Sequence, residues 1–572
     1  MKIKNIILGG LAAVSLASCA DMDYHEYKVD DKDYIANKFS NVYGFMTTIY
    51  KNLDYDLGSH YSGAMLASAT DEAVYSHQGN QIESFYNGAW GPSNANSATW
   101  SNAWKGISYC NLFLDEFNNL KFEDYQLDLN YKAEMEKYNN FQWEARWARA
   151  LFYFQLVRYY GGVPLKTENL DAETANNLPR ATADEIFQFI DDECVAIKDT
   201  IIKDYTKAFS ELGLIESGRA NNLEVLALRA RAALYHASPL FNPNNDKELW
   251  RKAAEANQDV INACKLRSMS LCTDYAAMFN ATSWSNAAAL KEVIFGVRLA
   301  KNNDIEKWNF PIGMENAGGG NCPTQNLVDA YECTDGLSIT ESPLYDPQNP
   351  YANRDPRLAM TIAVNGESYP DALGAPLQTY YGGSNGLPTT YGTPTGYYLK
   401  KYMNRDAVIG ASNATTNYHI FIQSRLAEFY LNYAEAMLNY TGSGYDKPSG
   451  FSMSAAEAIN TVRGRNGVKM PNIATGLSFD QFKEKYENER FIELAFEGHR
   501  FFDVRRWKEG PKYFVNIKTM KITKNADETF SYAVETNPTS ITKRQWDDKF
   551  YLAPIPQSEI MKAGNLEQNP GW

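Results

Sequence analysis

Apolar residues recur at three- and four-residue intervals along several stretches of this chain, which is the pattern of amphipathic helices. The clearest predicted helix covers residues 141–160 and is followed by Gly161-Gly162 and Pro164, which prevent its continuation. Further helices are predicted over residues 35–57, 100–114, 223–237 (with Asn222 as its N-cap), 424–440 and 454–465. Several place Ala beside Leu, Tyr or Phe at contact positions, as helix-turn-helix repeats do. The pattern therefore predicts a mainly α-helical protein, although the spacing is too irregular for a strict repeat consensus.

Between the helices, residues 242–420 have a different composition, rich in Gly, Pro, Asn and Tyr. The bias is strongest in Gly318-Gly319-Gly320 and in residues 377–398. Long loops of this kind are usually functional or disordered. We interpret residues 242–420 as a loop-rich insertion in the helical scaffold, with a few short strands at alternating runs such as 292–297 and 551–554.

The apolar stripe from Tyr486 to Trp507 predicts one further helix with a buried face. Gly498 lies inside this stripe, where glycine costs a helix about 1 kcal/mol relative to alanine. We therefore expect another backbone to pack closely against Gly498.

Charged residues flank this stripe. Glu489, Glu493 and Glu497 follow one another at four-residue intervals and would repel one another without cations. Arg490 and Arg500 are spaced to pair with Glu493 and Glu497 within the helix, and arginines from elsewhere are expected to neutralise the rest. Two carboxylates on one helical face also suit the general acid and base of a glycoside hydrolase. The interspersed arginines favour structural ion pairs over that alternative.

Two long motifs resemble a known family. Glu489–Trp507 resembles the signature of the SusD/RagB family, and Ala553–Ile560 with Asn565–Trp572 resembles its C-terminal ending. Asp355–Leu358 and Arg158–Leu165 are also similar to segments of that family. The resemblance implies a TPR-like scaffold of helix pairs and a non-catalytic glycan-binding lipoprotein of Bacteroidetes nutrient uptake. It also implies a partner, a SusC-like TonB-dependent transporter of the outer membrane, on which the protein acts as a lid.

The first residues have the features of a processing segment. Residues 1–18 read as a signal peptide with a basic start and an apolar stretch too short to span a bilayer. Leu16–Cys19 reads as a bacterial lipobox, which predicts that Cys19 becomes the acylated N-terminus and anchors the protein in the outer membrane, facing outward. The acidic residues 19–35 are expected to form a tether. The alternative is a cleaved secretory signal in which Cys19 is incidental.

Composition narrows the function. A formal charge of -14 and a pI near 5.1 argue against nucleic acid as a partner. We find no nucleophile motif, phosphate-binding loop, cofactor fingerprint or metal-ligand set, so no enzymatic activity, cofactor or metal is expected. The six cysteines beyond Cys19 contain no C-x-x-C pair. Disulfides Cys264–Cys272 or Cys322–Cys333 and free buried thiols remain open alternatives.

The sequence thus predicts three regions after the tether. Residues 36–241 form a helical TPR-like region that carries an aromatic loop over residues 71–97, residues 242–420 form the insertion, and residues 421–572 form a second helical region with the family's C-terminal motif.

Binding of a neutral glycan requires flat aromatic faces and a rim of hydrogen-bonding side chains. Two loop regions, residues 71–96 and 279–309, supply both kinds of residue. The candidate ligand-binding residues are Asp71, Tyr75, His77, Tyr86, Trp90, Asn94, Trp284 and Trp308. Trp90 lies between Gly88 and Gly91 and is the strongest single candidate, so Trp90→Ala is expected to weaken glycan binding and leave the fold intact. The tyrosines of residues 377–398 form a further candidate contact.

These observations predict a surface protein that captures oligosaccharides, with a fructan such as levan as one possible ligand. The alternatives are a glycoside hydrolase that acts through a carboxylate pair and a repeat lipoprotein that binds only other proteins. The glycan interpretation fails if Trp90 and Trp284 are buried and no exposed platform of aromatic rings lies nearby.

Overall fold

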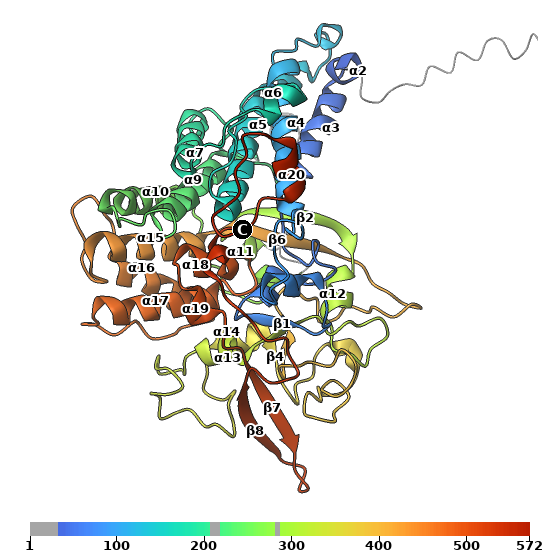
Figure 1. The fold of residues 1–572 in the computed structure, drawn as a ribbon, viewed down its shortest axis with the longest axis vertical. Coiled ribbons are helices and arrows are strands. Elements are labelled where there is room, and N and C mark those ends of the chain that lie inside the picture. Colours follow the sequence, from blue (N-terminus) through green and yellow to red (C-terminus); the bar gives the residue numbers. More distant parts are fainter. Residues whose placement is uncertain (1–31, 206–217, 281–286) are drawn as a thin grey trace, which may run out of the picture.

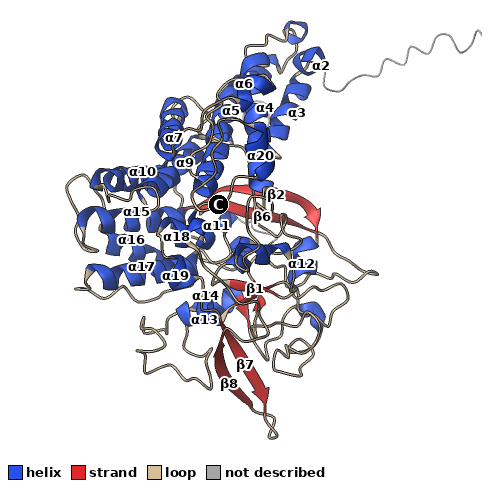
Figure 2. Cartoon of the chain, in the orientation of Figure 1, coloured by secondary structure: helices blue, strands red, loops and turns tan. Residues whose placement is uncertain are grey.

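The computed structural model describes residues 32–205, 218–280 and 287–572, in which helices dominate and the strands are short (Figures 1 and 2). The helices of the scaffold are α2 (Lys32–Ala36), α3 (Phe39–Tyr50), α4 (Ala98–Glu116), α5 (Tyr131–Tyr160), α6 (Ala172–Asn176), α7 (Ala183–Ile197), α9 (Asn222–Ala237), α10 (Lys247–Leu266), α15 (Leu426–Thr441), α16 (Ala455–Arg463), α17 (Phe479–Glu493), α18 (Arg500–Arg506), α19 (Gly510–Tyr513) and α20 (Gln557–Lys562). Between α10 and α15 lie α11 (Ala287–Leu290), α12 (Asp304–Asn309), α13 (Gln325–Ala330) and α14 (Pro356–Thr361).

The strands form antiparallel pairs. They are β1 (Ala73–Tyr75) with β3 (Asn321–Pro323), β2 (Val293–Asn302) with β6 (Asn417–Arg425), β4 (Ile362–Ala363) with β5 (Tyr398–Leu399), and β7 (Lys518–Lys524) with β8 (Phe530–Thr536). The β1–β3 pair joins the aromatic loop to the long segment between α10 and α15 and so positions the site described below.

The scaffold is a stack of helices that pack against their neighbours. Contacts run from α4 and α5 through α7 and α9 to α10, and then from α15 to α16 and α17. Figure 1 shows this stack descending from α3–α5 to α15–α17 along one side of the molecule. Helix α10 packs directly on α15, although residues 267–425 separate them in the chain. The prediction of a mainly α fold with a TPR-like scaffold, a loop-rich insertion and a few short strands is confirmed.

Three local predictions differ from the structure. Helix α5 starts ten residues before the expected position, at Tyr131. The side chain that caps α9 is that of Asn221, which accepts from Leu223 N, and not that of Asn222. Residues 551–554 form no strand, because a 3₁₀ turn over Asp548–Tyr551 occupies the start of that run.

The predicted single helix over residues 486–507 is wrong. Helix α17 ends at Glu493 and α18 begins at Arg500. In the turn between them Phe496 and Gly498 have φ values of +62° and +76°. Glycine adopts this left-handed conformation without a steric penalty, so Gly498 serves the turn. A Cβ on Gly498 would find its nearest atom, Phe421 Cζ, at 3.7 Å, so the expected close approach of another backbone is absent there.

The glutamate ladder is buried and neutralised by distant cations, as predicted. Glu489 and Glu493 are fully buried, and Glu497 is 5% exposed. Burial would raise the pKa of Glu493, but Arg465, Arg425 and Arg357 lower it to about 2. The cationic partners are Arg357 and Arg463 for Glu489, Arg357, Arg425 and Arg465 for Glu493, and Arg425 and Lys401 for Glu497. Removing one partner of such a buried network leaves an uncompensated charge, which typically costs about 3–5 kcal/mol.

The two pairs predicted within the signature helix do not form. Arg490 pairs with Asp503, with 2.7 Å between Nε and Oδ2, and Arg500 pairs with Asp71, with 2.7 Å between Nη2 and Oδ2. The break after Glu493 changes the direction of the chain, so arginines spaced for one continuous helix reach other carboxylates.

The cysteines and helices of the described residues settle two further points. Cys110, Cys194, Cys264, Cys272, Cys322 and Cys333 are buried free thiols, so neither disulfide left open by the spacing is present. Across the described ranges, none of the helices is both long and apolar enough to cross a bilayer.

Candidate functional site

Two of the predicted ligand residues lie where β1 ends. Tyr75 is the last residue of β1, and Ser76 continues the pairing by donating its backbone N–H to Gly320 O at 2.9 Å. His77 follows, and its Nε2 lies 2.6 Å from Gly318 O. Ser76 and His77 therefore both contact backbone carbonyl groups of the triple glycine. The contact with Gly318 O fixes the direction of the His77 ring.

The ring of His77 is the centre of an aromatic stack. Tyr391 lies parallel to it, with ring centroids 3.8 Å apart and planes at 4°. The Tyr75 ring also stacks on His77, with centroids 5.2 Å apart and planes at 30°. Tyr75 is 4% exposed, His77 is half-buried and Tyr391 is 48% exposed. The stack thus rises from the core to the surface and ends in the ring of Tyr391.

Trp308, on α12, adjoins the base of this stack. A Cβ placed on Gly63 would lie 2.7 Å from Trp308 Cγ and 2.5 Å from the Tyr75 hydroxyl. Both side chains therefore pack against the same glycine, and Trp308 is itself half-buried. We call Tyr75, His77, Trp308 and Tyr391 the aromatic platform.

Gly318-Gly319-Gly320 holds the parts of the platform together. Gly319 has φ +79°, and a Cβ there would lie 2.3 Å from Tyr391 O. A Cβ on Gly320 would lie 2.4 Å from Trp308 O. Only glycine permits these approaches. The triple glycine, which the sequence marked only as loop composition, is thus the structural link between β1, α12 and the tyrosine-rich loop.

Tyr391 adopts a left-handed backbone conformation, with φ +61°. For a bulky side chain this conformation costs on the order of 1–3 kcal/mol and persists only where its surroundings enforce it. Strain of this kind concentrates at ligand-binding positions. Tyr381, in the same loop, is 64% exposed and lies outside the His77 stack.

Three other predicted ligand residues cover or neutralise arginines of the C-terminal part. Asp71 is 3% exposed and accepts two hydrogen bonds from Arg500, at 2.8 and 2.7 Å. Tyr86 is 2% exposed, with its ring 4.6 Å from the Arg544 guanidinium. In this structure neither side chain presents a surface to a glycan, so the expectation of surface contacts at these two positions is corrected.

Trp90 is buried as well, with 4% of its surface exposed. Its ring lies 5.8 Å from the Arg505 guanidinium and packs edge-on against Phe85 and Trp572. Arg505 donates to the carbonyl oxygens of Phe501 and Phe550. Trp90 is therefore part of an aromatic cage around a buried cation, and the expectation that it exposes a ring is wrong.

The remaining predicted residues are placed as follows. Asn94 is exposed and donates its amide to Ala89 O at 3.0 Å, closing the turn after Trp90. Trp284 and Cys19 lie outside the described residues. Gln78, the next residue after His77, is exposed and donates its side-chain amide to Ser540 O at 2.8 Å.

The carboxylates of the signature are not arranged for acid–base catalysis. Glu489 and Glu493 are fully buried, and each accepts hydrogen bonds from arginines. A general acid must reach the glycosidic oxygen of a bound substrate. The platform, in contrast, offers stacked rings at the surface, which suit the apolar face of a sugar ring.

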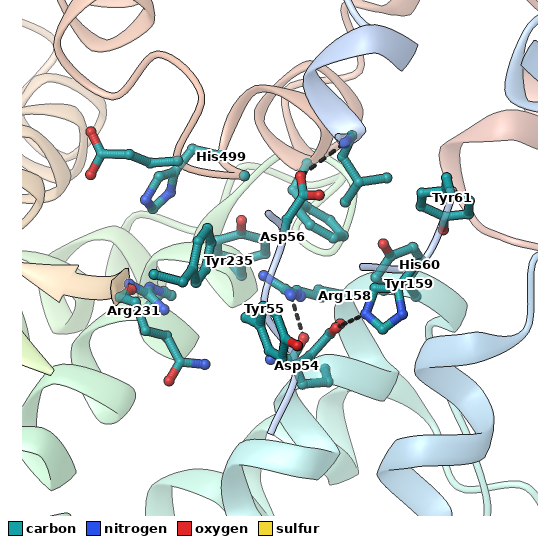
Figure 3. Close-up of a pocket in the computed structure, with 17 residues that line it drawn as sticks. Asp54, Tyr55, Asp56, His60, Tyr61, Arg158, Tyr159, Arg231, Tyr235 and His499 are labelled. Atoms are coloured by element: carbon teal, nitrogen blue, oxygen red, sulfur yellow. Dashed lines mark hydrogen bonds and ion pairs between the residues drawn. The ribbon is translucent and has the colours of Figure 1, made fainter. Parts of the chain in front are cut away.

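A small, partly open cavity lined by charged, polar and aromatic side chains shares no lining residue with the platform (Figure 3). Asp54, His60, Arg158 and His499 line it, and its volume is about 40 Å³. Ligand pockets typically measure about 300–1,000 Å³, whereas a cavity of this size accommodates water-sized molecules. Arg158 Nε and Gln423 Oε1, both on its lining, have no hydrogen-bond partner within the described part of the chain. The cavity is too small for a sugar ring.

Comparisons with known proteins give consistent results. A family model described as "SusD family" matches residues 291–572, and one described as "Starch-binding associating with outer membrane" matches residues 21–212. The chain is 26% identical over 446 residues to SusD-like protein P2 of Formosa agariphila, covering 75% of this chain and 73% of the relative.

Solved structures agree with this result. A SusD-like protein from Bacteroides fragilis aligns with a TM-score of 0.76 at 24% identity, covering 95% of this chain and 99% of the other. A second chain from the same species, titled a SusD-like carbohydrate binding protein, aligns with a TM-score of 0.72 at 25% identity and covers 93% of this chain and 100% of the other.

Proposed function

Because this chain belongs to the SusD/RagB family, we propose that it is a non-catalytic outer-membrane protein that binds glycans on the aromatic platform. It captures oligosaccharides outside the cell and delivers them to a SusC-like TonB-dependent transporter. Acylation of Cys19 anchors it to the membrane. The description of one matching family model, which names starch binding and association with the outer membrane, supports this proposal.

One observation carries the assignment of the site, namely the parallel stack of His77 and Tyr391 at 3.8 Å with Tyr391 48% exposed. A sugar ring binds by laying its apolar face on such a ring while its hydroxyls exchange hydrogen bonds at the rim. The strained backbone of Tyr391 and the close packing around Gly319 hold the ring in place before ligand arrives. Preorganisation of this kind reduces the entropic cost of binding.

The experiment compares two tyrosines of one loop. Soluble protein lacking residues 1–19 is screened on a glycan array, and its affinity for each hit is measured by calorimetry. Tyr391→Ala is expected to weaken binding about tenfold or more, because the outermost ring of the platform is lost. Tyr381→Ala, which removes an exposed ring outside the stack, is the matched control and is expected to keep affinity within about twofold.

An array without hits, together with co-purification of a transporter, would favour a protein that binds only proteins. Release of reducing ends on long incubation with polysaccharides would favour a glycoside hydrolase. Among glycans, a fructan such as levan is the specific ligand we propose to test first, with starch and xylan as comparisons.

A further inference from the structure

Two leucines stand fully in solvent at one end of the molecule. Leu127 is 99% exposed and Leu129 is 100% exposed, in the loop that joins α4 to α5. Transfer of one leucine side chain from water to an apolar environment is worth about 1.5–3 kcal/mol. The pair thus presents apolar surface that the rest of the chain leaves uncovered. We call Leu127 and Leu129 the leucine tip.

The leucine tip is held by a packed loop. Asp128 N donates to Tyr125 O at 2.9 Å, and Tyr131 N donates to Asp128 O at 3.0 Å, so backbone hydrogen bonds brace the residues on both sides of the leucines. Phe122 and Tyr125 pack on Phe39, with ring centroids 4.0 and 5.9 Å away. The exposure of the leucines is therefore a feature of an anchored loop.

This loop lies where the chain enters the fold. Phe39 is the first residue of α3, and Lys32, at the start of α2, forms an ion pair with Glu116 at the end of α4. Figure 1 shows α2 and the light-blue loop after α4 together at one extremity, with the β7–β8 hairpin at the opposite one. Residues 20–31 separate Cys19 from Lys32, and even a fully extended chain of that length spans at most about 45 Å. Acyl chains on Cys19 would keep this end near the lipid surface.

We propose that the leucine tip inserts into the lipid bilayer and makes a second membrane contact beside the acylated Cys19. This inference rests on the proposed lipidation. Two attachment points restrict the rotation that a single tether allows, and they direct the β7–β8 hairpin, at the opposite extremity of the molecule, away from the membrane (Figure 1). Glu123, Asp124 and Asp128 are close to the leucines in the chain, so this loop is acidic and favours a neutral lipid surface over an anionic one.

The test measures lipid contact at the tip in the full-length acylated protein. Leu129→Cys is labelled with an environment-sensitive fluorophore, since the six cysteines of the described residues are buried. The protein is reconstituted into phosphatidylcholine vesicles that carry a nitroxide quencher in their acyl chains. Fluorescence at position 129 is expected to fall by about half or more, because the label sits among the acyl chains. The matched control is the same label at Leu266→Cys, since Leu266 is 89% exposed at the end of α10, and it is expected to stay unquenched.

A second variant separates insertion from mere proximity. Leu127→Asp in the chain labelled at position 129 is expected to reduce quenching to the level of position 266. Quenching that persists in this variant, or that is equal at positions 129 and 266, overturns the proposal that the leucine tip inserts into the bilayer. Protein that does not float with the vesicles overturns the anchor at Cys19 and the tip with it. Glycan affinity in solution is expected to be unchanged by Leu127→Asp, which separates this inference from the proposed function.

Discussion

Two groups of aromatic residues come from the same short segment, residues 71–97, and end in opposite environments. Tyr75 and His77 join the aromatic platform, which ends in the exposed ring of Tyr391. Tyr86 and Trp90 cover the guanidinium groups of Arg544 and Arg505 and are buried. The difference shows that an aromatic residue in a glycine-rich loop is not necessarily a ligand contact. Its ring can pack instead on an arginine from a distant part of the chain.

The largest loss of stability is expected from Trp90→Ala, which removes a ring from the buried group. Removal of this ring leaves a cavity beside Arg505 and is expected to lower the free energy of unfolding by about 3–5 kcal/mol. Denaturant titration followed by circular dichroism measures the loss. Affinity for glycan, measured on the remaining folded protein, is expected to be unchanged. A stable Trp90→Ala protein with weakened glycan binding would place Trp90 in the site and reverse the comparison.

Low pH is expected to destabilise the buried, arginine-rich core of the fold and to leave glycan binding by the platform unchanged. Burial would raise the pKa of Glu493, but Arg465, Arg425 and Arg357 hold it at about 2 in the folded state against an ordinary value of 4.5, so its charge stabilises the fold above pH 4.5. That contribution, about 3 kcal/mol, is lost as the pH falls from about 4.5 to about 2. Glu72, whose pKa burial raises to about 8, acts in the opposite direction: it stays protonated in the folded state, whereas the unfolded chain releases this proton above about pH 4.5, so its contribution to stability rises slightly as the pH falls from about 5 to about 4.5 and is constant well below that.

Urea midpoints measured between pH 5 and pH 2.5 check this expectation. A midpoint that does not move over that range would contradict the assignment of Glu493 to a charged, arginine-paired state. The platform contains no carboxylate, so protein that remains folded at pH 4 is expected to bind glycan as it does at pH 5.

A third prediction concerns Gly319, whose close approach to Tyr391 joins the triple glycine to the tyrosine-rich loop. Gly319→Ala places a Cβ against Tyr391 O and is expected to cost about 2 kcal/mol of stability and to weaken glycan binding, because the tyrosine loop must shift. Gly382→Ala is the matched control, since Gly382 has φ +88° in the same loop but no atom within 4 Å of the added Cβ. It is expected to cost about 1 kcal/mol from backbone strain alone and to keep affinity. Equal losses of affinity in the two variants would show that the approach of Gly319 to Tyr391 does not matter.

The smallest effect is expected at the middle of the stack. His77→Ala removes the ring that supports Tyr391 and is expected to weaken glycan binding by about 1 kcal/mol, or roughly fivefold. His77→Phe retains a ring at this position while losing the contact with Gly318 O, and it is expected to restore most of the affinity. Calorimetry on both variants measures the difference. If His77→Phe binds as weakly as His77→Ala, the polar contact rather than the stack positions Tyr391.

The sequence selected some of the residues that form the aromatic platform. His77 and Trp308 lie in the two regions selected because they supply both aromatic rings and hydrogen-bonding side chains, and the structure brings them to one place through Gly318-Gly319-Gly320. Tyr391 was only one of several tyrosines in its loop. Nothing local distinguishes it from Tyr381, because the distinction is the contact with His77, which is distant in the chain.

The same reason explains the break in the signature. The three- and four-residue spacing continues past Glu493, so periodicity alone predicts one helix. Arg490 and Arg500 then find Asp503 and Asp71 after the chain turns at Phe496 and Gly498. Ion pairs between residues remote in sequence outweigh the local preference for continuing the helix.

What the sequence by itself determined are properties that short segments carry: amphipathic helices, a charge ladder that needs cations, and the motifs of the family. Tertiary structure alone decided which rings face solvent. Burial depends on what packs against a side chain from elsewhere, and the arginines that bury Tyr86 and Trp90 come from the other end of the chain. A residue's type states what it can contact, and only the assembled fold states what it does contact.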